Sequence, residues 1–164
     1  SRDLEAAQQL EQFLADGRGW VENEIEACRD LSACYHRLGQ EQKRFEALVA
    51  SLRYGPPRAE VCCDLGQYFF DIGDYQTAIF WYETAIQRPR SDTTGGFSNP
   101  DCHDYIPLLQ LCVCWYRLGD FQRAEALNEF AATVKPHSKA CGYNRAFFAA
   151  NHLETTDTQV APAD

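Results

Sequence analysis

One short turn motif occurs three times, and its spacing constrains the fold of this chain more than any other feature. The copies read RLGQ at 37–40, DIGD at 71–74 and RLGD at 117–120. Gly39 and Gly73 lie 34 residues apart, whereas Gly119 lies 46 residues after Gly73. A fixed period of this size is typical of stacked helical hairpins, so we expect 12 inserted residues before the last copy. The predicted repeats span about 25–58, 59–92 and 105–138.

Side-chain size repeats with the same period. The eighth position of each repeat is small, as Ser32, Gly66 and Cys112, and it follows a leucine every time. A small residue at the crossing of two helix axes lets the larger neighbours interdigitate. Each repeat is therefore expected to be a pair of packed helices.

These features resemble the tetratricopeptide (TPR) family over about 25–138, most closely in the segment DLGQYFFDIGDYQTAIFWYETA. The resemblance implies an all-α fold, a TPR-type superhelix (solenoid) of about three repeats. The first repeat departs from the family pattern at Arg44, where an alanine is usual, and we expect this arginine to extend its charged head out to water.

Segments that flank the repeats complete the predicted domain, which covers residues 1–154. Apolar residues recur at helical spacing over 3–15, and residues 139–153 read as a closing helix, because a repeat stack must cover its last apolar face. The insertion is expected as a loop over about 88–101. The polar residues 155–164 are expected to form a disordered tail or linker.

Charge and hydropathy exclude several classes of partner. Acidic residues outnumber basic ones 24 to 15, a net charge of −9, which argues against binding of nucleic acid. No apolar run is long enough to span a membrane, and no signal-peptide pattern is present, so we expect a cytoplasmic protein. The chain starts at Ser1 and contains no methionine, which suggests a piece excised from a longer protein.

Residues that could carry chemistry are few. The eight cysteines show no metal-binding CxxC spacing, and free, buried thiols are expected, with zinc or disulfides as the alternatives. His103 stands between Asp101 and Asp104, but these residues open a helix, where aspartate more often serves as a cap. No Ser/His/Asp or Cys/His arrangement is evident. We therefore predict no catalytic residue, no metal site and no cofactor.

The TPR resemblance implies a concave groove lined by the first helix of each repeat, which suits a protein or peptide partner. The Lys/Asn set with which some TPR proteins clamp a chaperone tail is missing, with Ala33 and Asp64 at such places. The alternative is that the groove positions hold ordinary solvated or half-buried residues. The predicted groove residues are Arg29, His36, Arg37, Glu60, Gln67, Phe70, Tyr116 and Arg117.

The inserted loop is the second candidate site. A loop of this length in a compact domain often serves binding, although a passive insertion would cost little entropy. An aromatic residue stands at its tip, between Gly-Gly and Asn-Pro. The predicted loop residues are Gly95, Gly96, Phe97, Asn99 and Asp101.

Several segments resemble a narrower group, the C-terminal TPR region of bacterial family 2 glycosyltransferases. They include WVENEIEAC, PPRAEVCCDLG, YQTAIFWYETA, GGFSNPD, YIPLLQLCVCWYRLGD and YNRAFF. In that family an N-terminal GT-A domain binds a nucleotide sugar and a divalent metal through a DxD motif, which this chain lacks. The resemblance implies a non-catalytic appendage that binds an acceptor polypeptide, positions the parent catalytic domain or dimerises.

Two hypotheses therefore stand side by side, because a free-standing TPR adaptor without any link to sugar transfer would show the same repeats. Homodimerisation is a further hypothesis. It arises from Ile79, Phe80 and Trp81, consecutive large apolar residues that one helix cannot all bury against a single neighbour.

Overall fold

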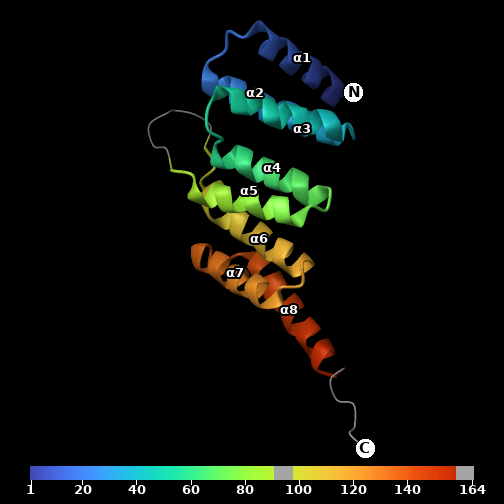
Figure 1. Ribbon diagram of the computed structural model, residues 1–164, viewed down its shortest axis with the longest axis vertical. Coiled ribbons are helices and arrows are strands. Elements are labelled where there is room, and N and C mark those ends of the chain that lie inside the picture. Colours follow the sequence, from blue (N-terminus) through green and yellow to red (C-terminus); the bar gives the residue numbers. More distant parts are fainter. Residues whose placement is uncertain (91–97, 158–164) are drawn as a thin grey trace, which may run out of the picture.

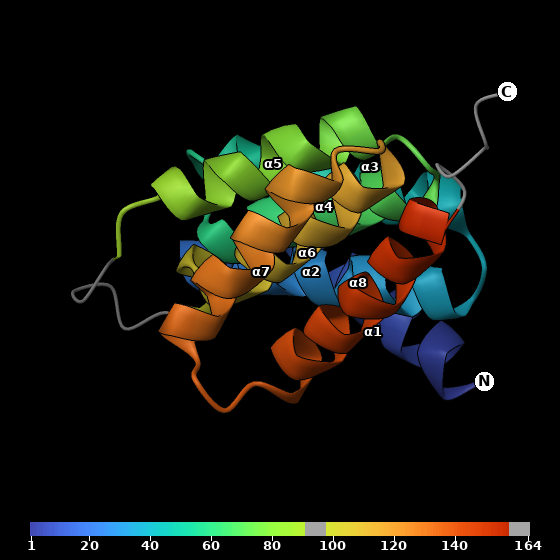
Figure 2. The same cartoon turned by 90° about the horizontal axis from the view of Figure 1, so that it is seen from below.

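The computed structural model describes residues 1–90 and 98–157, with side chains through residue 151, and all its regular elements are helical. Figure 1 shows the helices stacked in chain order along the long axis, and Figure 2 looks along this stack. The expected all-α fold is confirmed. The elements are α1 (Arg2–Asp16), α2 (Val21–Arg37), α3 (Glu41–Ala50), η1 (Ser51–Tyr54), α4 (Ala59–Asp71), α5 (Tyr75–Gln87), η2 (Pro100–His103), α6 (Tyr105–Arg117), α7 (Phe121–Val134) and α8 (Lys139–Asp157).

Three helix pairs, α2/α3, α4/α5 and α6/α7, form the predicted repeats, and the same turn joins the two helices of each pair. Gly39, Gly73 and Gly119 have φ values of 70°, 81° and 86°, in the left-handed region that favours glycine. In each turn the amide after the glycine donates to the carbonyl five residues earlier, at 2.9 to 3.0 Å. This bond closes the first helix and starts the second, so the three turns are structurally equivalent.

The start of the second helix differs between the repeats. Asp74 and Asp120 accept hydrogen bonds from the backbone amides of Thr77 and Arg123, and so cap α5 and α7. Gln40 occupies the same place before α3 and makes no side-chain cap. The first repeat therefore lacks an interaction that the other two share.

Gly66 marks the crossing of α4 and α5. A Cβ atom at this position would lie 2.8 Å from ring atoms of Tyr82, which is 1% exposed. The aromatic ring occupies the space that any larger residue would need. The predicted role of small residues at the helix crossing is confirmed here.

The flanking helices extend the stack at both ends. Helix α1 is capped by Ser1 at its start and by Gly17 after its last residue, and it packs on α2. Helix α8 begins at Lys139, which is 34 residues after Tyr105, the first residue of α6. It therefore takes the place of the first helix of a fourth repeat. Helix α8 continues to Asp157, past the start of the expected tail, and residues 158–164 lie outside the described part of the chain.

All eight cysteines are buried free thiols, as predicted. Burial raises the pKa of Cys28 and of Cys112 to about 11, so these thiols stay protonated at neutral pH and pack like small apolar side chains. Within the described residues, no helix is both long enough and apolar enough to cross a bilayer.

We predict that Gly66→Ala lowers the free energy of unfolding by about 1 to 3 kcal/mol, because the new methyl group must displace the buried ring of Tyr82. Chemical denaturation followed by circular dichroism measures the change. Gly142→Ala is the matched control, since Gly142 is helical with no atom within 4 Å of its virtual Cβ, and it should stabilise by roughly 0.5 to 1 kcal/mol. Equal effects at both positions would contradict the tight crossing.

Candidate interaction groove

Two hollows open between successive first helices of the repeats. The polar hollow, of about 210 Å³, lies between α2 and α4, and the aromatic hollow, of about 270 Å³, lies between α6 and α8. Glu26, Arg29, Asp30, Ser32, Ala33, His36, Arg44, Asp64 and Gln67 line the polar hollow. Val113, Tyr116, Arg117, Tyr143, Asn144, Phe147 and Phe148 line the aromatic hollow.

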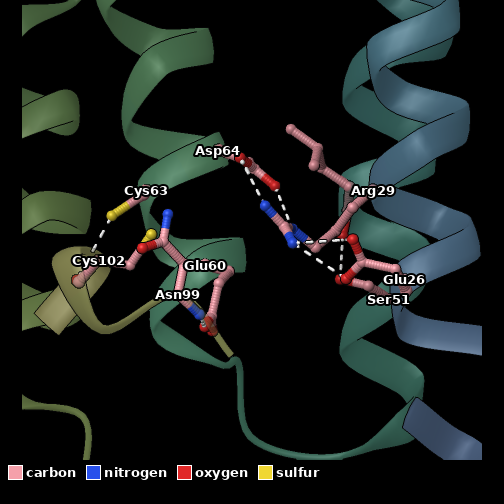
Figure 3. A network of polar contacts seen from close by, with 9 residues as sticks. Glu26, Arg29, Ser51, Glu60, Cys63, Asp64, Asn99 and Cys102 are labelled. Atoms are coloured by element: carbon pink, nitrogen blue, oxygen red, sulfur yellow. Dashed lines mark hydrogen bonds and ion pairs between the residues drawn. The ribbon is translucent and has the colours of Figure 1, made fainter. Parts of the chain in front are cut away.

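Ion pairs within the protein engage both arginines of the polar hollow. Arg29 on α2 pairs with Asp64 on α4 (Nε to Oδ2, 2.6 Å) and with Glu26 one turn away (Nη1 to Oε2, 3.0 Å), as Figure 3 shows. Burial alone would lower the pKa of Arg29, but the hydrogen bonds and charges of the two carboxylates outweigh it and raise the pKa. The guanidinium stays charged and links two neighbouring repeats.

Arg44 corrects one expectation from the sequence. Its side chain is only 6% exposed, and its Nη1 lies 2.8 Å from Asp71 Oδ2 and 2.9 Å from Glu41 Oε2. The guanidinium also lies 5.4 Å from the ring centre of Tyr68. The charged head does not extend to water as expected, because a carboxylate of the next repeat and an aromatic face hold it between the helices.

His36 shares this cluster and offers one ring nitrogen to two partners. Its Nδ1 lies 2.8 Å from Glu41 Oε1 and 3.0 Å from Arg44 Nη1. With a proton on Nδ1 the ring donates to Glu41, and without one it accepts from Arg44. The position of the proton on His36 therefore decides which of the two side chains it binds.

The aromatic hollow has a different chemistry. The ring of Tyr116 lies 5.3 Å from that of Phe147 and 5.8 Å from that of the buried Phe148, and these contacts form one wall. Tyr143 is 73% exposed and Phe147 is 38% exposed, so both present apolar surface to the solvent. Arg117 is exposed at the end of α6 and has no ion pair or hydrogen bond among the described residues.

Asn144 supplies the one side-chain amide in the described lining of the aromatic hollow. Its amide nitrogen donates to the side-chain oxygen of Asn128 (3.0 Å), and the buried Asn128 in turn donates to the carbonyl of Cys141 (3.1 Å). This chain of bonds fixes the orientation of Asn144. Its amide oxygen has no donor within the described part of the chain.

The structure distributes the predicted groove residues over several places. Arg29, His36 and Gln67 line the polar hollow, while Tyr116 and Arg117 line the aromatic hollow. The other three line neither of these hollows. Arg37 pairs with Asp3 of α1, Phe70 packs edge to face on Tyr75, and Glu60 is buried.

Tyr143, Asn144 and Phe147 were not among the predicted groove residues. A signal for two of them exists in the repeat spacing. Counting 34 residues from Tyr105 places Tyr143 and Phe147 at the fifth and ninth positions of a fourth repeat, which are the repeat positions of the predicted groove residues Arg29 and Gln67.

The predicted loop residues are only partly described. Gly95, Gly96 and Phe97 lie outside the described residues. Glu60 accepts a hydrogen bond from the Asn99 backbone amide at 2.7 Å (Figure 3), and Asp101 pairs with Lys135, the residue directly after α7. The C-terminal end of the insertion is therefore attached to α4 and to α7.

The residues around His103 serve the start of α6. Asp104 caps this helix through the amide of Tyr105, as the cap interpretation predicted. His103 Nδ1 lies 3.2 Å from the carbonyl of Arg88. In the part of the chain that the structure describes, no group of three or more His, Cys, Asp or Glu side chains could hold a metal ion.

The three consecutive apolar residues of α5, Ile79, Phe80 and Trp81, differ in their exposure to solvent. Ile79 is 7% exposed and Trp81 is half-buried against the core, whereas Phe80 is 59% exposed. Phe130 on α7 is equally exposed. Of the three residues behind the dimer hypothesis, only Phe80 presents most of its side chain to solvent.

Comparison with solved structures identifies the fold. The chain is similar to BtubC from P. vanneervenii (18% identity, TM-score 0.65, covering 99% of this chain and 61% of that chain). It is similar to MamA AMB-1 (20% identity, TM-score 0.65, covering 96% of this chain and 78% of that chain). It is also similar to PcrH in complex with the chaperone binding region of PopB (19% identity, TM-score 0.59, covering 81% of this chain and 98% of that chain). The fold is a TPR-type helical solenoid. No protein-family model and no curated protein matches the sequence.

We predict that Arg44→Ala lowers the free energy of unfolding by about 1 to 3 kcal/mol, because it removes a buried cation that links two repeats. Thermal and urea denaturation measure the loss. Arg145→Ala is the control, since the Arg145–Glu129 pair is exposed and its loss should change stability little. Arg44→Met separates packing from charge, and wild-type stability in this variant would show that the ion pairs add nothing net.

Proposed function

We propose that the chain is a protein-interaction domain that binds a peptide segment on the face formed by the first helices α2, α4, α6 and α8. The observation that carries the proposal is the aromatic hollow, where Tyr143 and Phe147 expose apolar surface beside Arg117, which has no partner among the described residues. Exposed aromatic residues that gather in a hollow are typical of interaction sites, and Tyr and Arg are frequent anchors there.

The polar hollow supports the proposal in another way. Arg29 and Arg44 are both engaged by carboxylates from the neighbouring repeat, so their charges stabilise the stack. These contacts hold adjacent first helices in a fixed relation. A peptide bound along this face would then meet a preorganised surface, which lowers the entropic cost of binding.

A neighbour of the same fold offers a parallel. PcrH was solved in complex with the chaperone binding region of PopB, so a protein of similar architecture holds a segment of another protein. This parallel supports the class of function only. The partner of the present chain has to be identified by its own chemistry.

The finer proposal is that this domain is the non-catalytic C-terminal part of a bacterial family 2 glycosyltransferase. Sequence segments such as GGFSNPD and YIPLLQLCVCWYRLGD support it. The domain would then bind the acceptor polypeptide, position the catalytic domain or dimerise. Eight free thiols favour a reducing compartment such as the cytoplasm. The alternative, a free-standing adaptor, keeps the interaction role and drops the link to sugar transfer.

Panning of random short peptides displayed on phage tests the interaction role. Enriched peptides should bind the wild type and lose affinity about tenfold for Tyr143→Ala and for Phe147→Ala, as measured by fluorescence anisotropy. Phe80→Ala and Phe130→Ala are the controls, because they truncate equally exposed aromatic residues on the second helices α5 and α7. Peptides that lose affinity only for the control variants would place the binding site on the second helices α5 and α7 and contradict the proposal.

Sequencing of the coding region upstream of Ser1 tests the finer proposal. An open reading frame that continues into alternating strands and helices with a DxD motif is expected for the glycosyltransferase. A start codon directly before Ser1 would favour the free-standing adaptor.

A further inference from the structure

The thirteenth position of each repeat is charged, and only one of these charges lacks a partner among the described residues. Arg37 in the first repeat pairs with Asp3, and Asp71 in the second pairs with Arg44. Arg117 in the third repeat makes no such contact. The cations of the polar hollow, Arg29 and Arg44, are likewise held by carboxylates, so of the two hollows only the aromatic hollow keeps a described cation available for a partner.

The surroundings of Arg117 favour a carboxylate beside an apolar group. A guanidinium binds carboxylates through paired hydrogen bonds, and such a bond strengthens next to surfaces from which a ligand excludes water. Tyr143 and Phe147 supply this apolar surface within the same hollow. Its volume of about 270 Å³ lies just below the range of about 300 to 1,000 Å³ for small-molecule pockets, which favours one or two side chains of a peptide.

We propose that the aromatic hollow selects peptide segments in which a large apolar side chain stands next to Asp or Glu. The apolar side chain packs on Tyr143 and Phe147, and the adjacent carboxylate pairs with Arg117. This inference rests on the proposed function and adds the chemistry of the ligand. Because the chain carries a net charge of −9, a segment with one acidic residue among neutral or basic ones avoids long-range repulsion.

The carboxylate belongs to a side chain within the segment rather than to a C-terminus. Capture of a chain terminus requires several donors that converge on one carboxylate. The lining of the aromatic hollow contains a single cation, Arg117, together with the hydroxyls of Tyr116 and Tyr143, and the amide nitrogen of Asn144 is already bound to Asn128. The free amide oxygen of Asn144 is instead suited to accept a backbone N–H of an extended segment.

Degenerate peptide pools provide the test. Three fluorescein-labelled pools with amidated C-termini contain a fixed Trp followed by Glu, Gln or Lys, and a fourth ends in Trp with a free carboxylate. The wild type should bind the Glu pool about tenfold more tightly than the Gln pool, because a hydrogen bond to a charged group is replaced by a neutral one. Raising the salt concentration should weaken this preference.

Substitutions assign the preference to a residue. Arg117→Gln should bind the Glu and Gln pools with equal affinity. Arg117→Glu should bind the Lys pool most tightly, because the charge at this position is reversed. Arg37→Gln is the matched control, because it removes an exposed arginine from the same repeat position at the other end of the stack, and the preference should persist. Circular dichroism confirms that each variant is folded.

Three outcomes would overturn the inference. Equal binding of the Glu and Gln pools by the wild type, or a preference that survives in Arg117→Gln, would remove the role of Arg117. Tighter binding of the free-carboxylate pool than of the Glu pool would show that the hollow binds a C-terminal carboxylate rather than an acidic side chain. In each case binding that still depends on Tyr143 and Phe147 leaves the proposed function intact, whereas absence of binding by every pool counts against both.

Discussion

The left-handed glycine turn is the constraint on which the whole stack depends. Each helix pair needs a residue that adopts positive φ at its corner, and glycine does so at little cost, as at Gly39, Gly73 and Gly119. The hydrogen bond that closes each turn fixes where the second helix starts. Since the corners are equivalent, the hairpins are equivalent too, and their first helices follow one another along one face of the molecule.

The two halves of this face are held by different forces. Two ion pairs join the first and second repeats. Arg29 on α2 pairs with Asp64 on α4, and Arg44 on α3 pairs with Asp71 on α4. Between α6 and α8 the contacts are aromatic, with Tyr116 against Phe147. A stack built from one hairpin can thus present a polar surface with internally paired arginines at one end and an apolar, cationic surface at the other, with no change in backbone architecture.

The sequence predicted the hairpins because their determinants are local. Glycine spacing and small residues such as Gly66 report on contacts within one repeat, and the structure confirms both. The burial of Arg44 was mispredicted because its partner Asp71 belongs to the next repeat, and such contacts depend on how the repeats stagger. Tyr116 and Arg117 of the aromatic hollow were predicted, but its α8 side follows only when the 34-residue spacing is continued past the third repeat, because an isolated helical pattern does not reveal that Tyr143 faces α6.

The attachment of the insertion has a consequence for cooperativity. In a linear stack each unit touches only its neighbours, so the longest connection is the natural place for the array to divide. Here Glu60 of α4 binds Asn99, and Lys135 at the end of α7 pairs with Asp101, so these contacts tie the second and third repeats together at that junction. Thermal fraying is then expected to begin at α1 and α8 and to reach the middle last.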